Sequence, residues 1–479
     1  MNYRMIARVL GLILLCLAGL LLLPLIAGLC YRENVANFLI TMAVSAAMGL
    51  VLICFKPRAT TLVARDGFVI VGLGWLLLSL LGALPYVLSG SIPHYIDALF
   101  ETASGLSTTG ATVVTDVEAM PRGDMFWRLF THWIGGMGVL VFLMAVLPMS
   151  GEHSMHIMRA EVPGPSVGKL VPRARQTAMI LYYIYIGLTL LETVLLLCGG
   201  LSFYEALLHA FSTAGTGGFS TRGASIAGFH SSYVETVITV FMLLFGVNFN
   251  LYFLLLMGRW KDALKNEELH WYLCIVFGAA LLLALGTQKI FGGFGAALHQ
   301  AFFNVGALIS TTGFGTVDFT VWPEYCKWIL IFLMFCGGCA GSTGGGIKLS
   351  RLMILGKYAQ AEIRQMIRPR SVTRIQMDGR RVERSTAQAA SVFLILYMAL
   401  LLLFAFLVSL DGFDIGTCFT ASLSCLSNIG PGMTGPIGPA GSFAIFSYRS
   451  KLLLSLAMLL GRLEIYPILV LLSPRTWRR

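Results

Sequence analysis

The chain contains the stretch Ser107-Thr108-Thr109-Gly110-Ala111, and variants of this Thr/Gly pattern return three more times. The later copies are Ala214-Gly215-Thr216-Gly217-Gly218-Phe219-Ser220, Ser310-Thr311-Thr312-Gly313-Phe314-Gly315 and Ser427-Asn428-Ile429-Gly430-Pro431-Gly432. Their central glycines, Gly110, Gly218, Gly313 and Gly430, lie 108, 95 and 117 residues apart. Glycine allows backbone angles that direct successive carbonyls toward a common axis. Four such strands could form rings of carbonyls that replace the hydration shell of a cation.

The composition indicates an integral membrane protein. Of the 479 residues, 57% are hydrophobic and only 12% are charged, which is more apolar surface than a soluble chain of this length could hide. Several stretches exceed eighteen nearly uncharged residues, as membrane-spanning helices do. The first of them, Leu10 to Ala27, could instead be a signal peptide, but it is long enough to span and no small-residue cleavage site follows it.

The four Thr/Gly stretches share one setting, which predicts an all-α fold of ten transmembrane helices. Each lies between a short half-apolar segment and a long apolar helix, and a further long helix precedes the short segment. The short segments cannot cross about 30 Å of hydrocarbon, so we expect re-entrant pore helices. The expected units are an N-terminal pair of helices (1–66), pore repeat 1 (67–150), pore repeat 2 (151–260), pore repeat 3 with an intramembrane loop (261–355), a cytoplasmic basic loop (356–386) and pore repeat 4 (387–479).

Hydropathy places the boundaries of these segments. The expected long helices are 9–29, 37–55, 67–89, 126–148, 177–200, 233–257, 271–290, 327–350, 388–409 and 451–472. The expected pore helices are 96–106, 204–212, 295–309 and 415–426.

The distribution of lysine and arginine predicts the orientation. The termini and the loops near 56–66, 149–177, 258–270 and 348–386 hold 25 of the 34 Lys and Arg residues. The positive-inside rule therefore places both termini in the cytoplasm and every Thr/Gly stretch in the outer half of the membrane.

The outer segments are rich in carboxylates, which could form an acidic vestibule that concentrates cations. Ordinary solvated loops would explain the same residues equally well. The carboxylates are Asp97, Glu101, Asp116, Glu118, Asp124, Glu205, Asp318, Glu324, Asp411 and Asp414.

The unit of helix, pore helix, Thr/Gly stretch and helix, repeated four times in one chain, resembles the Trk/Ktr/HKT superfamily of potassium transporters. The two extra leading helices make the chain most similar to the bacterial TrkH/TrkG branch, and the resemblance covers almost the whole sequence. It implies four repeats in a pseudo-fourfold arrangement around a pore. The K+-binding filter residues that it implies are Thr108, Thr109, Gly110, Thr216, Gly217, Gly218, Thr311, Thr312, Gly313, Asn428, Ile429 and Gly430.

Glycine at all four central positions favours K+ selectivity in the resembled family. The second and fourth stretches depart from Thr-Thr-Gly, so the four need not contribute equal ligands.

A second glycine-rich stretch, from Phe335 to Lys348, interrupts an apolar helix, and so many glycines are unfavourable in a helix. It is not a nucleotide-binding loop, because Leu349 stands where Ser or Thr should follow the lysine. In the resembled family this stretch is an intramembrane gate, whereas tight packing by small residues is the alternative. The expected gating residues are Gly337, Gly338, Gly341, Gly344, Gly345, Gly346, Lys348 and Arg462.

Arg462 lies deep in the last apolar helix, where a charge is costly and usually functional. It could bond the carbonyls of 336–346, or it could extend to the cytoplasmic interface near Arg475. Glu464, two residues further on, faces away from it on an ideal helix. The position of His132 is more typical of a packed or interfacial histidine than of a proton relay.

These features predict K+ uptake across the bacterial inner membrane through a single-chain filter gated by the glycine-rich stretch. The alternatives are a secondary transporter of another small solute and a Na+-permeable cation transporter. An enzyme is disfavoured, since neither H-E-x-x-H nor G-x-S-x-G occurs. We expect no cofactor in this chain and no nucleic-acid partner, because the net charge of +11 suits cytoplasmic loops and membrane lipids.

The resemblance also implies partners: a second copy in a homodimer and a cytosolic, nucleotide-binding TrkA-like ring. The basic surfaces available to such a ring are Arg364, Arg368, Arg370, Arg374, Arg380, Arg381 and Arg384, with Arg173, Arg175, Arg475, Arg478 and Arg479. A solvated loop that faces lipid would explain the basic segment equally well.

Overall fold

The structure is a computed structural model that describes residues 1–55, 63–138, 174–370 and 374–477. The described part is helical apart from one short antiparallel hairpin, β1 (Gln376–Met377) and β2 (Arg380–Arg381). Within it, six helices are long and apolar enough to cross a membrane, or seven if one bent pair counts as a span. The helical membrane architecture is therefore as predicted, whereas ten spans remain a prediction.

The N-terminal helices form two closely packed antiparallel spans. The first is α1 (Tyr3–Leu20) continued by α2 (Leu22–Cys30), and the second is α3 (Ala36–Ile53). Gly11 on α1 faces Gly49 on α3, and a Cβ atom at Gly11 would lie 2.7 Å from the carbonyl oxygen of Gly49. Small residues at such positions let membrane helices approach closely.

The rest of the chain falls into four successive groups of helices, each with a short helix between longer ones. The first group is α4 (Ala64–Gly82), α5 (Leu84–Ser89), α6 (Tyr95–Leu106) and α7 (Arg122–Met137). The second is α10 (Ala174–Cys198), α11 (Phe203–Gly215), η1 (Ser225–Phe229), α12 (Ser232–Phe245), α13 (Phe249–Leu256) and α14 (Trp260–Leu264).

The third group is α15 (Glu267–Thr287), α16 (Phe294–Ile309), η2 (Phe319–Val321), α17 (Glu324–Cys336) and α18 (Leu349–Ile367). The fourth is α19 (Arg384–Ser409), α20 (Ile415–Ser427), η3 (Gly435–Ile437), η4 (Phe443–Ile445), α21 (Tyr448–Arg462), α22 (Tyr466–Leu472) and α23 (Pro474–Trp477).

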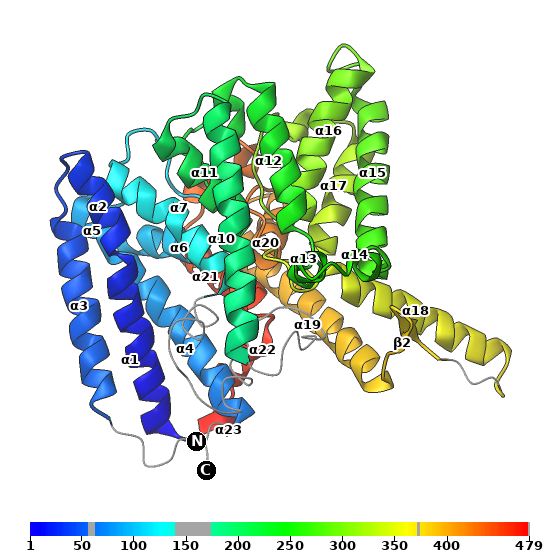
Figure 1. Cartoon of the computed structure of the whole chain (residues 1–479), viewed down its shortest axis with the longest axis horizontal. Coiled ribbons are helices and arrows are strands. Elements are labelled where there is room, and N and C mark those ends of the chain that lie inside the picture. The colour runs from blue at the N-terminus through cyan, green and yellow to red at the C-terminus, as the bar shows by residue number, and fades with distance from the viewer. Residues whose placement is uncertain (56–62, 139–173, 371–373, 478–479) are drawn as a thin grey trace.

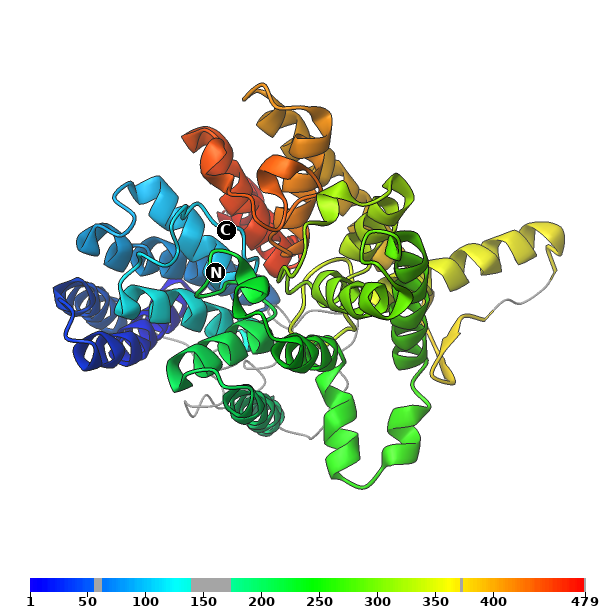
Figure 2. The ribbon, with the colours of Figure 1, turned by 90° about the horizontal axis from the view of Figure 1, so that it is seen from above.

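The four groups pack in a closed cycle. Helix α7 contacts α11, α12 contacts α16, α17 contacts α20, and α21 contacts α6 of the first group. Seen from above, the groups surround a common centre in chain order (Figure 2). The C-terminal half of each short helix is buried, so the segments that follow these helices begin inside the protein.

The predicted helix 327–350 is interrupted at its glycine-rich stretch, where α17 ends at Cys336, and two further predicted helices are broken. The predicted helix 233–257 bends by 91° between α12 and α13. The break frees the carbonyl of Gly246 and the amide of Phe249, and both bond to the glycine-rich stretch, through Cys339 and Gly341. The predicted helix 451–472 ends at Arg462 and restarts at Tyr466, where Pro467 suits the first turn of a new helix.

The predicted basic loop 356–386 is largely ordered secondary structure. Helix α18 continues through it as far as Ile367 and extends away from the body of the molecule (Figure 1). A small apolar cluster packs part of this segment against α18 and the start of α19. Its buried members are Ile354, Ala387 and Ala390, and Ile375, Met377 and Val382 pack against them.

The two ends of the chain lie side by side at one end of the molecule (Figure 1). The hydroxyl of Tyr3 donates to the carbonyl of Trp477 at 3.3 Å. An even number of membrane crossings would give this arrangement, and the side of the membrane remains a prediction.

Candidate functional site

The four Thr/Gly stretches, called turns 1 to 4 below, have the same backbone conformation. Each lies where a short helix ends, and each enters the left-handed region at one residue and again two residues later. The first positions are Thr108 (φ 57°), Thr216 (φ 55°), Thr311 (φ 63°) and Asn428 (φ 56°). The second are Gly110 (φ 81°), Gly218 (φ 83°), Gly313 (φ 76°) and Gly430 (φ 106°).

This conformation explains the residue types found at the turns. Asparagine and glycine tolerate positive φ, whereas a β-branched threonine does so only at a cost of about 1–3 kcal/mol. The chain accepts that cost in three of the four turns. Such strain persists where the surrounding structure fixes the backbone for a purpose.

Each central glycine lies against the backbone of the next turn. A Cβ atom at Gly110 would lie less than 3.0 Å from the carbonyl oxygen of Gly217 in turn 2. The same relation holds between Gly218 and Thr312, between Gly313 and Ile429, and between Gly430 and Thr109. The last contact returns to turn 1, so the four turns form a closed ring of backbone.

A pocket of about 200 Å³ opens on one side of this ring. All four central glycines line it, together with the residues that follow each turn. Its lining holds two cationic side chains, Arg128 and Arg222, and no carboxylate of the described chain.

The lining of this pocket is therefore not acidic, and several of the carboxylates named for a vestibule contact other residues. Asp97 pairs with Lys451 at 2.6 Å, and Asp124 is buried and hydrogen-bonded by Asn37. Asp414 caps α20, and the side chain and amide of Thr417 that bond to it hold its pKa below the usual range.

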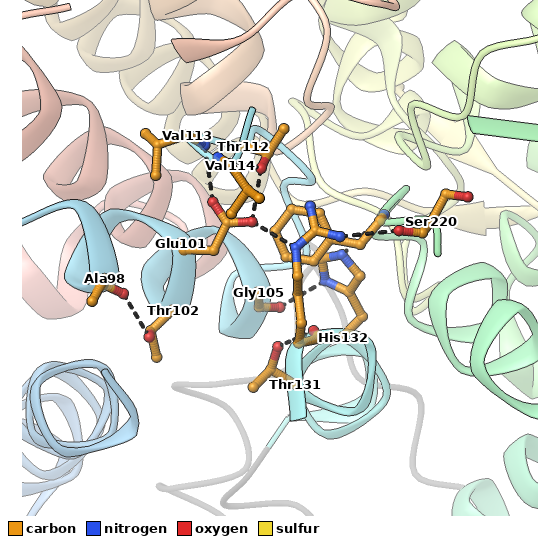
Figure 3. Close-up of polar contacts among 12 residues, drawn as sticks. Ala98, Glu101, Thr102, Gly105, Thr112, Val113, Val114, Thr131, His132 and Ser220 are labelled. Carbon is orange, nitrogen blue, oxygen red and sulfur yellow. Dashed lines mark hydrogen bonds and ion pairs between the residues drawn. The ribbon is translucent and has the colours of Figure 1, made fainter. Parts of the chain in front are cut away.

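Glu101 also departs from that prediction, because it forms a buried brace at turn 1. It lies on α6 with no exposed surface, and its carboxylate contacts the Arg128 guanidinium of α7 at 2.6 Å. The same carboxylate accepts hydrogen bonds from the hydroxyl of Thr112 and the amide of Val113, both at 2.9 Å (Figure 3). Glu101 thus fixes the extended segment that follows turn 1.

Arg128 extends the brace to turn 2. Its guanidinium donates to the carbonyl of Ser220 at 3.1 Å and lies 3.6 Å from the ring centre of Phe219. His132, one turn further along α7, is buried and bonds the carbonyl of Gly105 through Nδ1 at 2.8 Å. Its Nε2 accepts from the amide of Phe219 at 3.2 Å. His132 is therefore a packed histidine, as predicted, and it joins the end of α6, which precedes turn 1, to turn 2.

The glycine-rich stretch, called the glycine loop (337–348), leaves the helical path and returns to its starting point. The amide of Ile347 donates to the carbonyl of Phe335, and the amide of Leu349 donates to the carbonyl of Gly338. Gly337 and Gly346 touch at the neck, both with positive φ. The two ends of the loop therefore lie together, between α17 and α18.

The tip of the glycine loop contacts turns 3 and 4. The amide of Gly345 donates to the hydroxyl of Thr311 at 2.7 Å. The backbone of Gly344 lies against Ser310, and that of Gly345 lies against Ser427. The tip therefore meets the residues that enter the turns, whereas the pocket is lined by the residues that leave them.

Arg462 is buried and bonds the loop tip. Its guanidinium donates to the carbonyl of Thr343 at 2.7 Å and also to the carbonyls of Gly135 and Gly136 on α7. The predicted contact with 336–346 is present, and the interfacial alternative is wrong. Glu464 pairs with Arg351 at 2.6 Å instead, because the chain is no longer helical where it leaves α21.

Lys348 forms hydrogen bonds across the inside of the glycine loop. Its ammonium group is buried and donates to the carbonyl of Gly344 and, at 3.3 Å, to the hydroxyl of Ser342. The four turns that carry the twelve predicted filter residues thus form one ring. Of the predicted gating residues, Gly344 and Gly345 lie against turns 3 and 4.

Comparison with known proteins agrees with this architecture. The family model TrkH, described as a cation transport protein, matches residues 33–291 and 292–478. This chain belongs to the TrkH cation transport family. It is 35% identical to the Trk system potassium uptake protein TrkH of Salmonella typhimurium, over the full length of both chains. It is 33% identical to the Trk system potassium uptake protein TrkG of Escherichia coli K12, over 100% of this chain and 99% of the relative.

The fold also matches that of a solved family structure. The crystal structure of the potassium transporter TrkH from Vibrio parahaemolyticus superposes with a TM-score of 0.89 at 32% identity, and the match covers both chains completely. Membership of the TrkH family and the apolar helices together indicate a multi-pass protein of the bacterial inner membrane.

Three residues of this TrkH-family site were missed in the sequence. Arg128 lies inside a predicted apolar helix, so its intramembrane charge was a signal that could have found it. Glu268 lies in the expected loop near 258–270, where a carboxylate is ordinary, and Asn248 lies inside the expected helix 233–257, which breaks at this point only in the structure. Only the fold places Glu268 within 2.7 Å of the Ala340 amide and the side chain of Asn248 against Gly341.

Proposed function

We propose that this protein takes up K+ through the ring formed by its four turns. The observation that carries the proposal is the contact of each central glycine with a carbonyl of the next turn, repeated four times around a closed cycle. Backbone carbonyls around one axis can replace the hydration shell of K+. The names of the relatives, which are potassium uptake proteins and a potassium transporter, support the same ion.

The glycine loop is the proposed gate of this pathway. Its tip lies beneath turns 3 and 4, and Arg462 ties that tip to α7 across the ring. A closed state held by hydrogen bonds to a charged guanidinium can open when those bonds are exchanged, and each contributes about 1.5–3 kcal/mol.

The proposed setting has both termini in the cytoplasm, which agrees with the lysine and arginine distribution. The basic segment Arg364–Arg384 would then face the cytosol and receive a TrkA-like regulatory ring, in keeping with the "Trk system" in the names of the relatives. We further propose a homodimer, as the family resemblance implies. The exposed side chains of Met366 and Ile367 at the end of α18 offer apolar contacts beside the arginines.

The test is uptake by a K+-uptake-deficient bacterium at low external K+, together with flux through purified protein in liposomes. We expect growth to be restored, and we expect K+ and Rb+ to pass in preference to Na+. Equal Na+ flux would favour the alternative of a Na+-permeable transporter. Uptake of another solute with no K+ flux would favour a secondary transporter and overturn the proposal.

A further inference from the structure

The start of α15 contacts both the glycine loop and the cytoplasmic hairpin. Three consecutive residues, Asn266, Glu267 and Glu268, stand at this position. Asn266 caps the helix by accepting a hydrogen bond from the amide of Leu269 at 2.9 Å. The rigid first turn of a helix thereby holds the two following carboxylates in fixed positions.

Glu268 fastens the two sides of the glycine loop. It is buried, and one carboxylate oxygen accepts from the amide of Ala340 at 2.7 Å and from the amide of Ser350 at 3.0 Å. Ala340 lies within the loop, and Ser350 is in the first turn of α18. Charge-assisted bonds to both make Glu268 a single anchor for the loop and for the helix that follows it.

Asn266 and Glu267 hold the hairpin β1–β2. The carboxylate of Asp378, at the hairpin turn, accepts from the Asn266 side chain at 2.9 Å and from the Glu267 amide at 2.7 Å. In return, the Glu267 carboxylate accepts from the Asp378 amide at 3.1 Å. Lys357 of α18 bonds Glu267 and also donates to the carbonyl of Gln376 at 2.8 Å.

We infer that Asn266–Glu268 is a coupling joint that positions the glycine loop according to the state of the cytoplasmic hairpin. The inference rests on the proposed function, because it concerns how that gate is controlled. The hairpin lies in the basic segment, so a partner that displaces it would act on α15 through Asp378. The same helical turn carries Glu268. If this turn moved, the hydrogen bonds from Glu268 to the amides of Ala340 and Ser350 would both break.

The test is amide hydrogen exchange of the full-length protein in lipid nanodiscs. Asp378→Gly removes the carboxylate and still suits the positive φ of 52° at this turn. We expect exchange in the peptide covering 337–350 to become about tenfold faster, although Asp378 touches none of those residues. Coupling between two sites is reciprocal, so Glu268→Gln should speed exchange at 374–382.

The matched control is Glu362→Gln, which breaks the exposed pair with Arg384 at 3.0 Å on the same cytoplasmic segment. It should leave exchange in 337–350 unchanged. Unaltered exchange in the glycine loop of Asp378→Gly would overturn the inference, as would an equal effect of Glu362→Gln. If Glu268→Gln fails to insert, the Asp378→Gly arm decides alone.

Flux separates this inference from the proposed function. Both joint variants should raise basal K+ flux when the wild-type protein conducts K+. A wild-type protein that carries no K+ would refute the proposed function. The exchange measurements would then still test whether Asn266–Glu268 couples the hairpin to the glycine loop. Wild-type K+ flux with unchanged exchange in Asp378→Gly would refute the joint alone.

Discussion

The guanidinium of Arg462 donates to the carbonyl of Thr343 at 2.7 Å, which links the end of α21 in the fourth group to the tip of the glycine loop. The same guanidinium reaches the carbonyls of Gly135 and Gly136 in the first group. One buried side chain therefore joins the loop to the opposite side of the ring, and the first prediction concerns its removal.

Arg462→Gln should raise the basal K+ flux. Loss of a charge-assisted bond worth about 1.5–3 kcal/mol shifts a two-state gate about tenfold to hundredfold toward the open state. Rb+ flux into liposomes at matched protein density measures the effect, with exposed Arg449→Gln as the control. Flux that stays the same or falls would indicate that Arg462 only packs the helices.

Alanine at the central glycines should lower the selectivity for K+ over Na+ before it lowers expression. At Gly110, Gly218 or Gly313 the new Cβ would collide with a neighbouring carbonyl and must displace it. Gly430→Ala should be the mildest of the four, because its closest contact is 2.8 Å. The K+/Na+ flux ratio measures the change.

The control for this series is Gly278→Ala on α15, where nothing lies within 4 Å of the added Cβ atom. Wild-type ratios in several correctly inserted glycine variants would rule out the ring as the filter.

Thr311→Val should raise the basal flux more than Thr108→Val does. Both substitutions remove a hydroxyl at the same backbone position, but only the Thr311 hydroxyl accepts a bond from the loop, at Gly345. The Thr108 hydroxyl donates instead to the carbonyl of the preceding residue, Ser107. Comparison of the two variants in one flux assay cancels any loss of an ion ligand. Equal flux through both would show that this bond does not hold the loop closed.

Breaking the Glu101–Arg128 pair should destabilise the protein and loosen turn 1. Arg128→Met leaves a buried carboxylate unpaired, at a cost of about 3–5 kcal/mol. The double variant Glu101→Gln with Arg128→Met should regain part of that loss, because it removes both charges. Thermal unfolding in detergent measures the stabilities, and the K+/Na+ flux ratio measures the effect on the ring.

The half-exposed pair Arg222–Glu205, at 2.7 Å, provides the comparison for this cycle. Arg222→Met should cost at most about 1 kcal/mol. If Arg128→Met costs no more than that, the buried pair does not brace the ring.

Charge reversal at Arg368, Arg370 and Arg374 should weaken binding of the proposed cytosolic ring. These side chains are exposed on the basic segment, so their attraction to an acidic partner should fall as salt screens it. Co-purification with a TrkA-like protein at low and high salt measures the effect. Full nucleotide-dependent gating of the purified pore alone would contradict the need for a partner.

The sequence by itself determined the helical membrane class and the positions of the four turns. These depend on local properties: apolar runs long enough to span, segments too short to span, and glycine where the backbone enters positive φ. The contact between Arg462 and the glycine loop was also predictable, because a charge inside an apolar helix must find polar partners.

Only the tertiary structure decided the closed ring, the breaks after Phe245 and Arg462, and the roles of Glu101, Arg128 and Glu268. Each depends on contacts between segments far apart in the chain. Glu101 read as a solvated carboxylate because nothing nearby in sequence neutralises it, and Arg128 meets it only once α6 packs against α7. A charge's surroundings determine whether it is exposed or buried in a pair, and the fold assembles those surroundings.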